Sequence, residues 1–222
     1  MTHLRSALLI LFVFLLSGCS QRFQDVNSTL DEALFGFDDF THNQEHVEDL
    51  PYASMYVRIN QGPQLFMVLA YAETNPVTGN TQLKWFSSDK AMITTENGRI
   101  VKTNRLPGAN LVGLSSSTQL AVPTSDTIAW QAEYDWQPNY HFAQRAQVAS
   151  YPVGTGVTKS LLWEKQTRHI KEVVTFNHSQ QVMENNYWID ERGSVVKSHQ
   201  QLIPHLLEVE FEVLKPYVES LL

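Results

Sequence analysis

The chain has 222 residues, of which 43% are hydrophobic and 18% charged, and its formal net charge is −7. This length and composition suit a folded domain with a proper core and exclude a disordered or low-complexity chain. An acidic chain without a basic cluster also argues against nucleic acid as a partner. Cys19 is the only cysteine, so the sequence offers neither a disulfide framework nor a thiolate metal site.

The first segment is predicted to be a lipoprotein signal peptide. Arg5 precedes an unbroken apolar run, Ala7–Leu16, which is too short to cross a bilayer core of about 30 Å as a helix. The next residues, LSGC at 16–19, resemble the bacterial lipobox. The resemblance implies cleavage before Cys19 and acylation of this residue on its sulfur and its new amino terminus. The alternative is an ordinary signal peptide that has a cysteine near its end by chance.

Acylation of Cys19 would anchor the protein permanently in a membrane. Two acyl chains already give stable anchoring, and a lipoprotein carries three. Ser20 follows the cysteine, where lipoproteins retained in the inner membrane often carry Asp, so we expect the periplasmic face of the outer membrane. The expected organisation is therefore a signal peptide at 1–18, a lipidated tether at 19–25 and a single barrel-like domain at 26–222.

The start of this domain is expected to be helical. Apolar residues recur at spacings of four, four and three between Val26 and Phe37, which predicts an amphipathic helix of roughly three turns. Thr41 and Gln44 have the spacing of a capping box, so a second, short helix is expected to follow and to end before Pro51.

This second helix contains a metal-site pattern. His42, Glu45 and His46 form H-x-x-E-H, the pattern of the inverted zinc peptidases. Two imidazoles four residues apart share one helix face and can bind one Zn²⁺, with the Glu as base. A peptidase also needs a third protein ligand, and its zinc helix is usually long, whereas this one lies between Thr41 and Pro51. We interpret the segment as a solvated helix face and expect no metal, no cofactor and no catalytic residue.

After Pro51 the apolar pattern changes to a period of two. Short segments rich in Val, Ile, Thr and aromatic residues are predicted to be strands at 54–60, 64–73, 81–88, 90–95, 99–104, 128–136, 141–151, 168–178, 185–191, 194–201 and 207–213. Turn pairs such as Asn97-Gly98 and Arg192-Gly193 separate many of them. The fold is therefore predicted to be mainly β, a large antiparallel meander sheet rolled into a partly open barrel, with short N-terminal helices.

The aromatic residues are the next candidates for a binding site. Core packing accounts for most of them, because aromatic side chains dominate β cores. One or two are expected to reach solvent, where an aromatic ring can stack on the apolar face of a sugar. The segment DWQPNY is the best candidate for an exposed patch, because it contains a Pro-Asn turn that would present it to solvent. We therefore predict that Asp135, Trp136 and Tyr140 contact a glycan or a protein partner.

Several longer segments resemble one known family. They are 16–19, 50–73, 83–111, 185–204 and 214–217, and they resemble the YjbF/YmcC-type (GfcB-like) outer-membrane lipoproteins of Gram-negative bacteria. Members of this family are encoded with exopolysaccharide and group 4 capsule genes. The resemblance implies a partly open meander barrel and a non-enzymatic accessory role in the secretion or assembly of surface polysaccharide. Its implied partners are other secretion proteins or the glycan, and it carries over no catalytic residues.

Two other functions stay open from the sequence. One is a glycan-modifying enzyme of the same pathway, with Asp or Glu residues at the barrel mouth, although the sequence contains no known catalytic motif that would support it. The other is a carrier that shelters a lipid or glycolipid inside the barrel. A filled interior would favour the accessory role, a cleft with two facing carboxylates the enzyme, and an apolar cavity the carrier.

Overall fold

The computed structural model describes residues 44–116, 120, 122–124 and 129–218. A short helix, α3 (Gln44–Asp49), comes first and ends before Pro51, as predicted. The helix predicted between Val26 and Phe37 lies outside the described residues. Within the described ranges no helix is long and apolar enough to cross a membrane.

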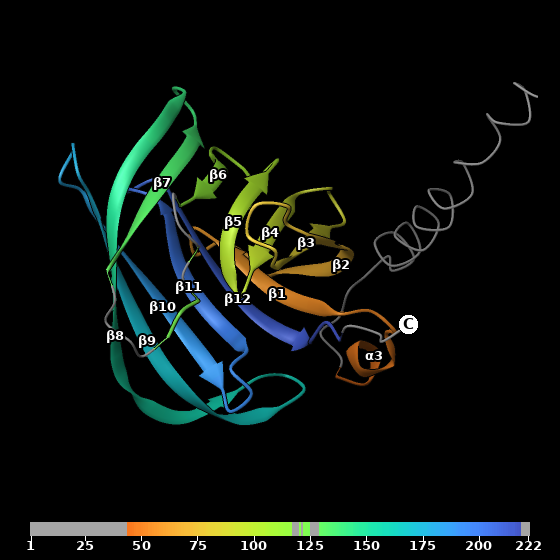
Figure 1. Ribbon diagram of the computed structural model, residues 1–222. Coiled ribbons are helices and arrows are strands. Elements are labelled where there is room, and N and C mark those ends of the chain that lie inside the picture. The colour runs from red at the N-terminus through yellow and green to blue at the C-terminus, as the bar shows by residue number, and fades with distance from the viewer. Residues whose placement is uncertain (1–43, 117–119, 121, 125–128, 219–222) are drawn as a thin grey trace, which may run out of the picture. The chain divides into compact units, whose positions relative to one another are not determined.

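Twelve strands follow α3 as one antiparallel meander (Figure 1). They are β1 (Ser54–Ile59), β2 (Leu65–Thr74), β3 (Thr81–Ser87), β4 (Met92–Glu96), β5 (Arg99–Asn104), β6 (Asn110–Ser115), β7 (Trp130–Gln137), β8 (His141–Lys159), β9 (Glu164–Phe176), β10 (Val182–Asp190), β11 (Val195–Ile203) and β12 (Leu207–Lys215). Their order in the sheet is β5-β4-β3-β2-β1-β12-β11-β10-β9-β8-β7-β6. Successive turns alternate between two ends of the barrel. We call the end with the β7–β8 and β9–β10 turns the upper end, and the end with the β4–β5 and β10–β11 turns the lower end.

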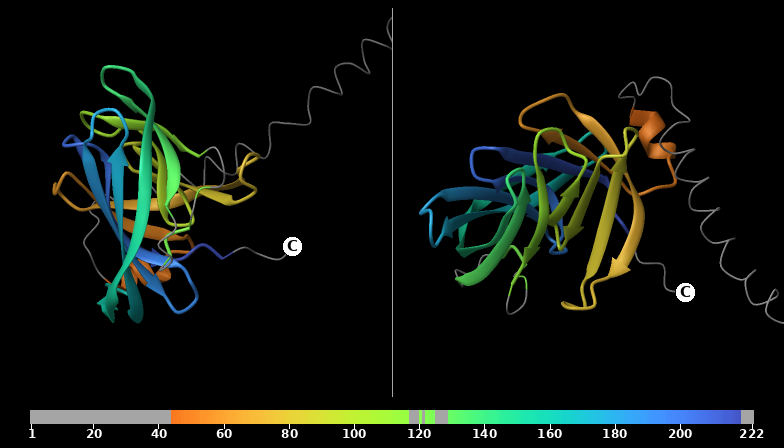
Figure 2. Two further views of the ribbon diagram at one scale, coloured as in Figure 1. Left: turned by 60° about the vertical axis from the view of Figure 1, so that its left-hand side comes forward. Right: turned by 90° about the horizontal axis from the view of Figure 1, so that it is seen from above.

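The barrel is nearly closed, because the two edge strands, β5 and β6, meet (Figure 2). Side chains join them near the upper end. The hydroxyl of Thr103 accepts the backbone N–H of Leu111 at 2.9 Å, and the side-chain oxygen of Asn110 accepts the N–H of Leu106 at 3.0 Å. These bonds satisfy backbone groups that an open edge would leave exposed. The predicted mainly-β, partly open meander barrel is therefore confirmed.

The apolar half of each alternating strand faces the interior and fills most of it. On β12, for example, Val209 and Phe211 are buried, whereas Glu208, Glu210 and Glu212 between them are only half-buried. The inward residues of most strands join one continuous apolar cluster. Burial of this surface is the main source of the free energy that stabilises the fold.

The lower end of β5 crosses the barrel interior to β11. Five strands separate β5 from β11 in the sheet order, yet the side-chain amide of Gln200 on β11 binds the β5 backbone. Its oxygen accepts the N–H of Ile100 at 2.9 Å, and its nitrogen donates to the carbonyl of Gly98 at 3.1 Å. One buried glutamine thus satisfies two peptide groups that a neighbouring strand would otherwise bind. This crossing holds β5 inside the barrel.

The β8–β9 hairpin is longer than the sequence predicts, since β8 runs on to Lys159 instead of ending at Tyr151. Figure 1 shows it curving along the lower end of the barrel towards the end of β12. There the indole N–H of Trp163 donates to the carbonyl of Val213 at 2.8 Å, and the Ser160 hydroxyl donates to Glu212 at 2.5 Å. These two bonds fix the hairpin tip against β12.

A carboxylate ties the β2–β3 turn to β4. Glu96 is buried and accepts hydrogen bonds from the side-chain amides of Asn75, Asn80 and Gln82, each at 2.9 Å. Burial alone would raise the pKa of Glu96, but these bonds and one from Thr78 outweigh it and lower this pKa below its ordinary value of 4.5.

The lowered pKa gives a pH-dependent prediction. A carboxylate whose pKa is lower in the folded state stabilises the fold fully above its unfolded pKa, and this stabilisation is lost as the pH falls through the folded value. The wild type should therefore be more stable than Glu96→Gln at pH 7, and the difference should shrink in acid, below 4.5. Urea unfolding of both proteins across this range is the measurement. A difference that does not change with pH would contradict the prediction.

Candidate functional site

An ion pair lies buried inside the barrel. Arg99, at the start of β5, binds Glu172 of β9 through two hydrogen bonds of 2.6 and 2.7 Å, and the two residues are 1% and 0% exposed. The Ser150 hydroxyl also donates to Glu172 at 3.0 Å, and Arg99 donates to the Tyr187 hydroxyl at 3.1 Å. The guanidinium lies 5.0 Å from the ring centre of Trp130. The pair therefore joins the inward-turned β5 to the opposite wall.

The surroundings of this pair shift the pKa of Arg99 and of two neighbouring tyrosines. Burial would lower the pKa of Arg99, but the charge of Glu172, the nearby tyrosines and the hydrogen bond to Glu172 together outweigh it and raise this pKa. Burial raises the pKa of Tyr134 and of Tyr187, although Arg99 opposes the shift. Both phenols therefore keep their protons at neutral pH. A charged, mutually bound pair among protonated phenols holds the structure together but has no free acid or base to offer a substrate.

The buried carboxylates in the described ranges all accept hydrogen bonds or form ion pairs. Of the buried acids in the described ranges, Glu96 binds three amides and Glu172 binds Arg99. Asp190 binds Lys165 at 3.1 Å and caps the β10–β11 turn by accepting the backbone N–H groups of residues 192 and 194. Each buried carboxylate thus has a local structural task. The pair of facing carboxylates expected of a glycan-cleaving enzyme is not among these contacts.

Only part of the zinc-peptidase pattern lies within the described residues. His42 lies outside the described residues, and for His46 the backbone alone is described, within α3. In the described part of the chain no three His, Cys, Asp or Glu side chains gather in a way that could hold a metal ion. Val47 of the helix and Leu50 directly after it are buried, and Lys215 at the end of β12 donates to the backbone carbonyls of Glu48 and Leu50. Cys19, the predicted lipidation residue, also lies outside the described ranges.

The β7–β8 hairpin brings together the three residues predicted to contact a partner, with different roles. Trp136 is 7% exposed and stacks on His141 with 5.0 Å between ring centres. Asp135 accepts the backbone N–H of Ala143 at 2.7 Å, which fixes a left-handed residue (φ 52°). Tyr140 alone of the three is largely exposed, at 73%. Trp136 and Asp135 therefore hold the hairpin, and Tyr140 faces solvent.

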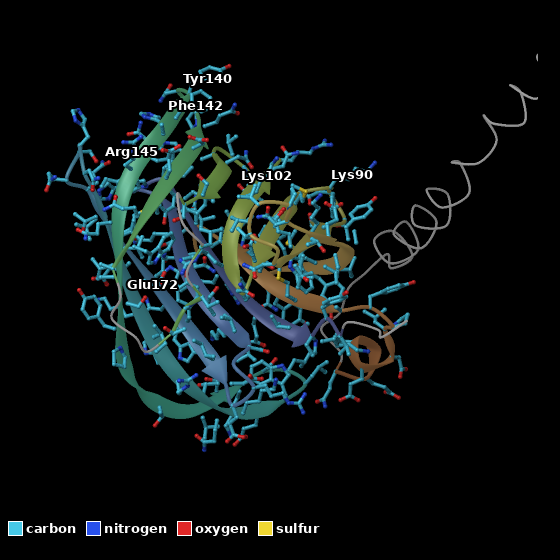
Figure 3. All side chains as sticks on the ribbon, viewed as in Figure 1. Lys90, Lys102, Tyr140, Phe142, Arg145 and Glu172 are labelled. Carbon is cyan, nitrogen blue, oxygen red and sulfur yellow. The ribbon has the colours of Figure 1, made fainter. Side chains whose placement is uncertain are left out.

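Phe142 is the functional candidate that sequence reasoning missed. It is 53% exposed, and its ring centre lies 6.3 Å from that of Tyr140. Figure 3 shows both side chains at the tip of the hairpin, at the upper end. Phe142 was predicted to be an ordinary strand residue. The bulge at Ala143 that interrupts the strand has no sequence signature, because alanine rarely adopts a positive φ. We call Tyr140 and Phe142 the aromatic tip.

A groove of about 500 Å³ begins directly after the aromatic tip. It lies between β8 and the β9–β10 turn, and its polar lining residues include Gln144, Arg145, Asn177 and His178. Arg145 is 73% exposed at its side chain and lies 3.5 Å from Glu133. Amide, guanidinium and imidazole groups beside exposed aromatic rings are the combination that binds hydroxyls and the apolar face of a sugar ring.

The other aromatic candidates serve the fold. Trp85, Trp130 and Tyr187 are buried in the interior, and Trp163 and Trp188 are half-buried on the barrel surface. On the outer face, Trp188 stacks on His169 with 4.6 Å between ring centres. Core packing thus accounts for most of the set, as expected.

The meander order, the apolar interior and the near closure of the sheet define a twelve-stranded up-and-down β-barrel. The chain belongs to the family of the group 4 capsule polysaccharide lipoproteins GfcB and YjbF, which matches residues 27–214. The family resemblance found in the sequence is therefore confirmed, and the family is one of lipoproteins associated with capsule polysaccharide.

Individual relatives support this membership. The chain is 30% identical over 219 residues to the lipoprotein GfcB of Escherichia coli K12, covering 96% of this chain and 99% of that protein. It is 32% identical over 213 residues to the lipoprotein YjbF of the same strain, covering 93% and 96%. The crystal structure of the E. coli K12 lipoprotein YmcC matches with a TM-score of 0.68 and 30% identity, over 79% of this chain and 89% of that one.

Proposed function

We propose that this protein is a lipid-anchored, non-enzymatic accessory protein that assists the secretion or assembly of a surface polysaccharide. It is held at the periplasmic face of the outer membrane by acyl chains on Cys19. Membership of the family of capsule polysaccharide lipoproteins carries the proposal. The barrel supports it, since its buried carboxylates and its buried arginine are bound to one another or to structural donors.

The aromatic tip and the neighbouring groove are the proposed contact with the glycan. Tyr140 and Phe142 offer two adjacent ring faces to solvent, and exposed aromatic pairs of this kind mark interaction sites more often than they serve folding. Sugar rings carry apolar C–H faces that stack on aromatic rings, while Arg145 and Asn177 reach hydroxyl groups from the groove. The hairpin is preorganised, because Trp136 and Asp135 fix it from beneath. Other secretion proteins remain proposed partners of the same surface.

A deletion strain complemented with variants tests both parts of the proposal. Wild type should restore surface polysaccharide, and Cys19→Ala should not, because the protein loses its anchor. Loss of both rings in Tyr140→Ala with Phe142→Ala should weaken binding of the purified polysaccharide about tenfold and lower its amount on the cell surface. Tyr151→Ala, on the same strand at 46% exposure, is the matched control and should complement fully.

The two parts of the proposal fail separately. Unchanged surface polysaccharide in the deletion strain would refute the accessory role. Unchanged polysaccharide binding by the double variant would refute the aromatic tip as the contact, while leaving the accessory role in place. Urea unfolding of each variant checks that lost binding does not reflect lost folding.

A further inference from the structure

A second hollow lies at the lower end of the barrel, away from the aromatic tip. It has a volume of about 400 Å³, within the range typical of small-molecule sites. The ends of β3, β4 and β12 and the turn between β10 and β11 form its wall. We call it the mouth cavity.

The wall of the mouth cavity is apolar and uncharged. Met55, Trp85 and Phe211 form its deepest part and are 0%, 2% and 3% exposed. Leu83 and Val213 are half-buried and lie nearer to solvent. None of the lining residues in the described ranges is charged. An ionised ligand group would therefore lose its hydration here without gaining a charged partner. Burial of a hydrocarbon chain, in contrast, would be favourable by about 25 cal/mol per Å² of apolar surface removed from water.

Most of the polar groups that line the cavity lie towards the outside. Asn97 and Ser194 belong to the two turns of the lower end and are exposed, and Thr81 is half-buried at the start of β3. Deeper in the cavity, the Thr95 hydroxyl accepts the indole N–H of Trp85 at 3.0 Å, so the indole places no unsatisfied donor there. An apolar interior with an uncharged, hydrogen-bonding rim matches a molecule that has an aliphatic chain and a neutral, hydroxyl-bearing head.

The mouth cavity also opens where the chain enters the barrel. The first described element, α3, is held to the last residues of β12 by Lys215, and Pro216 and Tyr217 directly after it line the cavity. The segment before α3 carries Cys19, the predicted lipid anchor.

We propose that the mouth cavity binds the aliphatic chain of a glycolipid and leaves the neutral sugar head at the rim formed by Asn97, Ser194 and Thr81. The inference concerns a different site from the aromatic tip and does not depend on the accessory role. Binding to the purified protein tests it without any measurement of surface polysaccharide.

The test uses the full mature chain with Cys19→Ser, so that no acyl group of its own can fill the cavity. Dodecyl maltoside below its micelle concentration is titrated against tryptophan fluorescence, with maltose and dodecylphosphocholine as the two comparison probes. We expect saturable binding of dodecyl maltoside at one site, at least about tenfold tighter than maltose and than dodecylphosphocholine. The fluorescence change should be largely lost in Trp85→Phe.

Two blocking variants and one control complete the test. Leu83→Glu adds a charge to the cavity wall, and Val213→Phe reduces its volume, so each should weaken binding of dodecyl maltoside at least about tenfold. Both positions are half-buried, and Val153→Glu, at an exposed position of β8, is the matched control that should bind normally. Equal binding of maltose would show a sugar site, and equal or tighter binding of dodecylphosphocholine a general lipid site. Either result, or normal binding by both folded blocking variants, would overturn the proposal.

Discussion

Replacement of Glu172 by glutamine should lower the free energy of unfolding by roughly 3–5 kcal/mol, because it removes the carboxylate charge that binds the buried guanidinium of Arg99. The two side chains are nearly the same size, so the change adds little cavity or clash. A domain of this kind is stable by roughly 5–15 kcal/mol in total. The variant should therefore unfold at a much lower urea concentration than the wild type, as measured by circular dichroism.

A neighbouring ion pair supplies the matched control. Lys171 and Glu184 lie 2.7 Å apart on the outer face, with their side chains 35% and 52% exposed. Solvent screens such a pair, so Glu184→Gln should change stability by less than about 1 kcal/mol. The double variant Arg99→Met with Glu172→Leu removes both buried charges and should recover most of the loss. Similar costs for Glu172→Gln and Glu184→Gln would mean that the buried pair does not hold β5 in place.

The fold class could be predicted because the sequence signals that specify it lie within each strand and each turn. Period-two alternation places one face of each strand inside, and turn pairs such as Asn97-Gly98 and Arg192-Gly193 mark where strands end. Both glycines have a positive φ, of 79° and 83°, as such turns require. A meander with short links has few alternative arrangements. The sequence was therefore sufficient for the fold class and for the positions of most strands.

The second half of the β8 strand was missed for a physical reason. This half carries Pro152, Gly154 and Gly156, which normally indicate a turn or loop. In the fold this half pairs with β9 on one side only, because the β7 ladder reaches no further than the pairing of Trp130 with Val148. Proline is tolerated on such an edge, where its missing N–H faces no neighbouring strand. Whether a strand is an edge is a property of the sheet and cannot be read from the segment itself.

Which side chains face solvent and which meet across the barrel was harder to predict than the fold. DWQPNY was correctly placed on a turn, and Tyr140 is exposed as expected, but Trp136 faces inward because it precedes the turn on the core face of β7. Arg99 and Glu172 are 73 residues apart in the chain, and an isolated Arg and Glu give no indication of such a contact. Pairs of this kind depend on how the sheet closes, which the local pattern does not encode.

Gly98→Ala is expected to lower the free energy of unfolding by roughly 2–5 kcal/mol, combining a left-handed backbone with a steric clash. Gly98 has a φ of 79°, and a Cβ at this position would lie 2.3 Å from the Cβ of Val195 on β11. That neighbour is part of a strand and cannot rotate away. The substitution should push β5 off β11, weaken both hydrogen bonds to Gln200 and enlarge the mouth cavity that Gly98 and Val195 line.

Two other glycines separate the clash from the backbone strain. Gly79 and Gly108 have φ values of 73° and 78°, but a Cβ on either would have no atom within 4 Å. Gly79→Ala and Gly108→Ala should therefore cost only roughly 1–2 kcal/mol, the backbone part alone. If the contact with Val195 causes the rest, Gly98→Ala combined with Val195→Gly should cost less than the sum of the two single substitutions. Equal costs at all three glycines, measured by urea unfolding, would mean that β5 can move away from β11 freely, and the crossing strand would then be a loose part of the barrel.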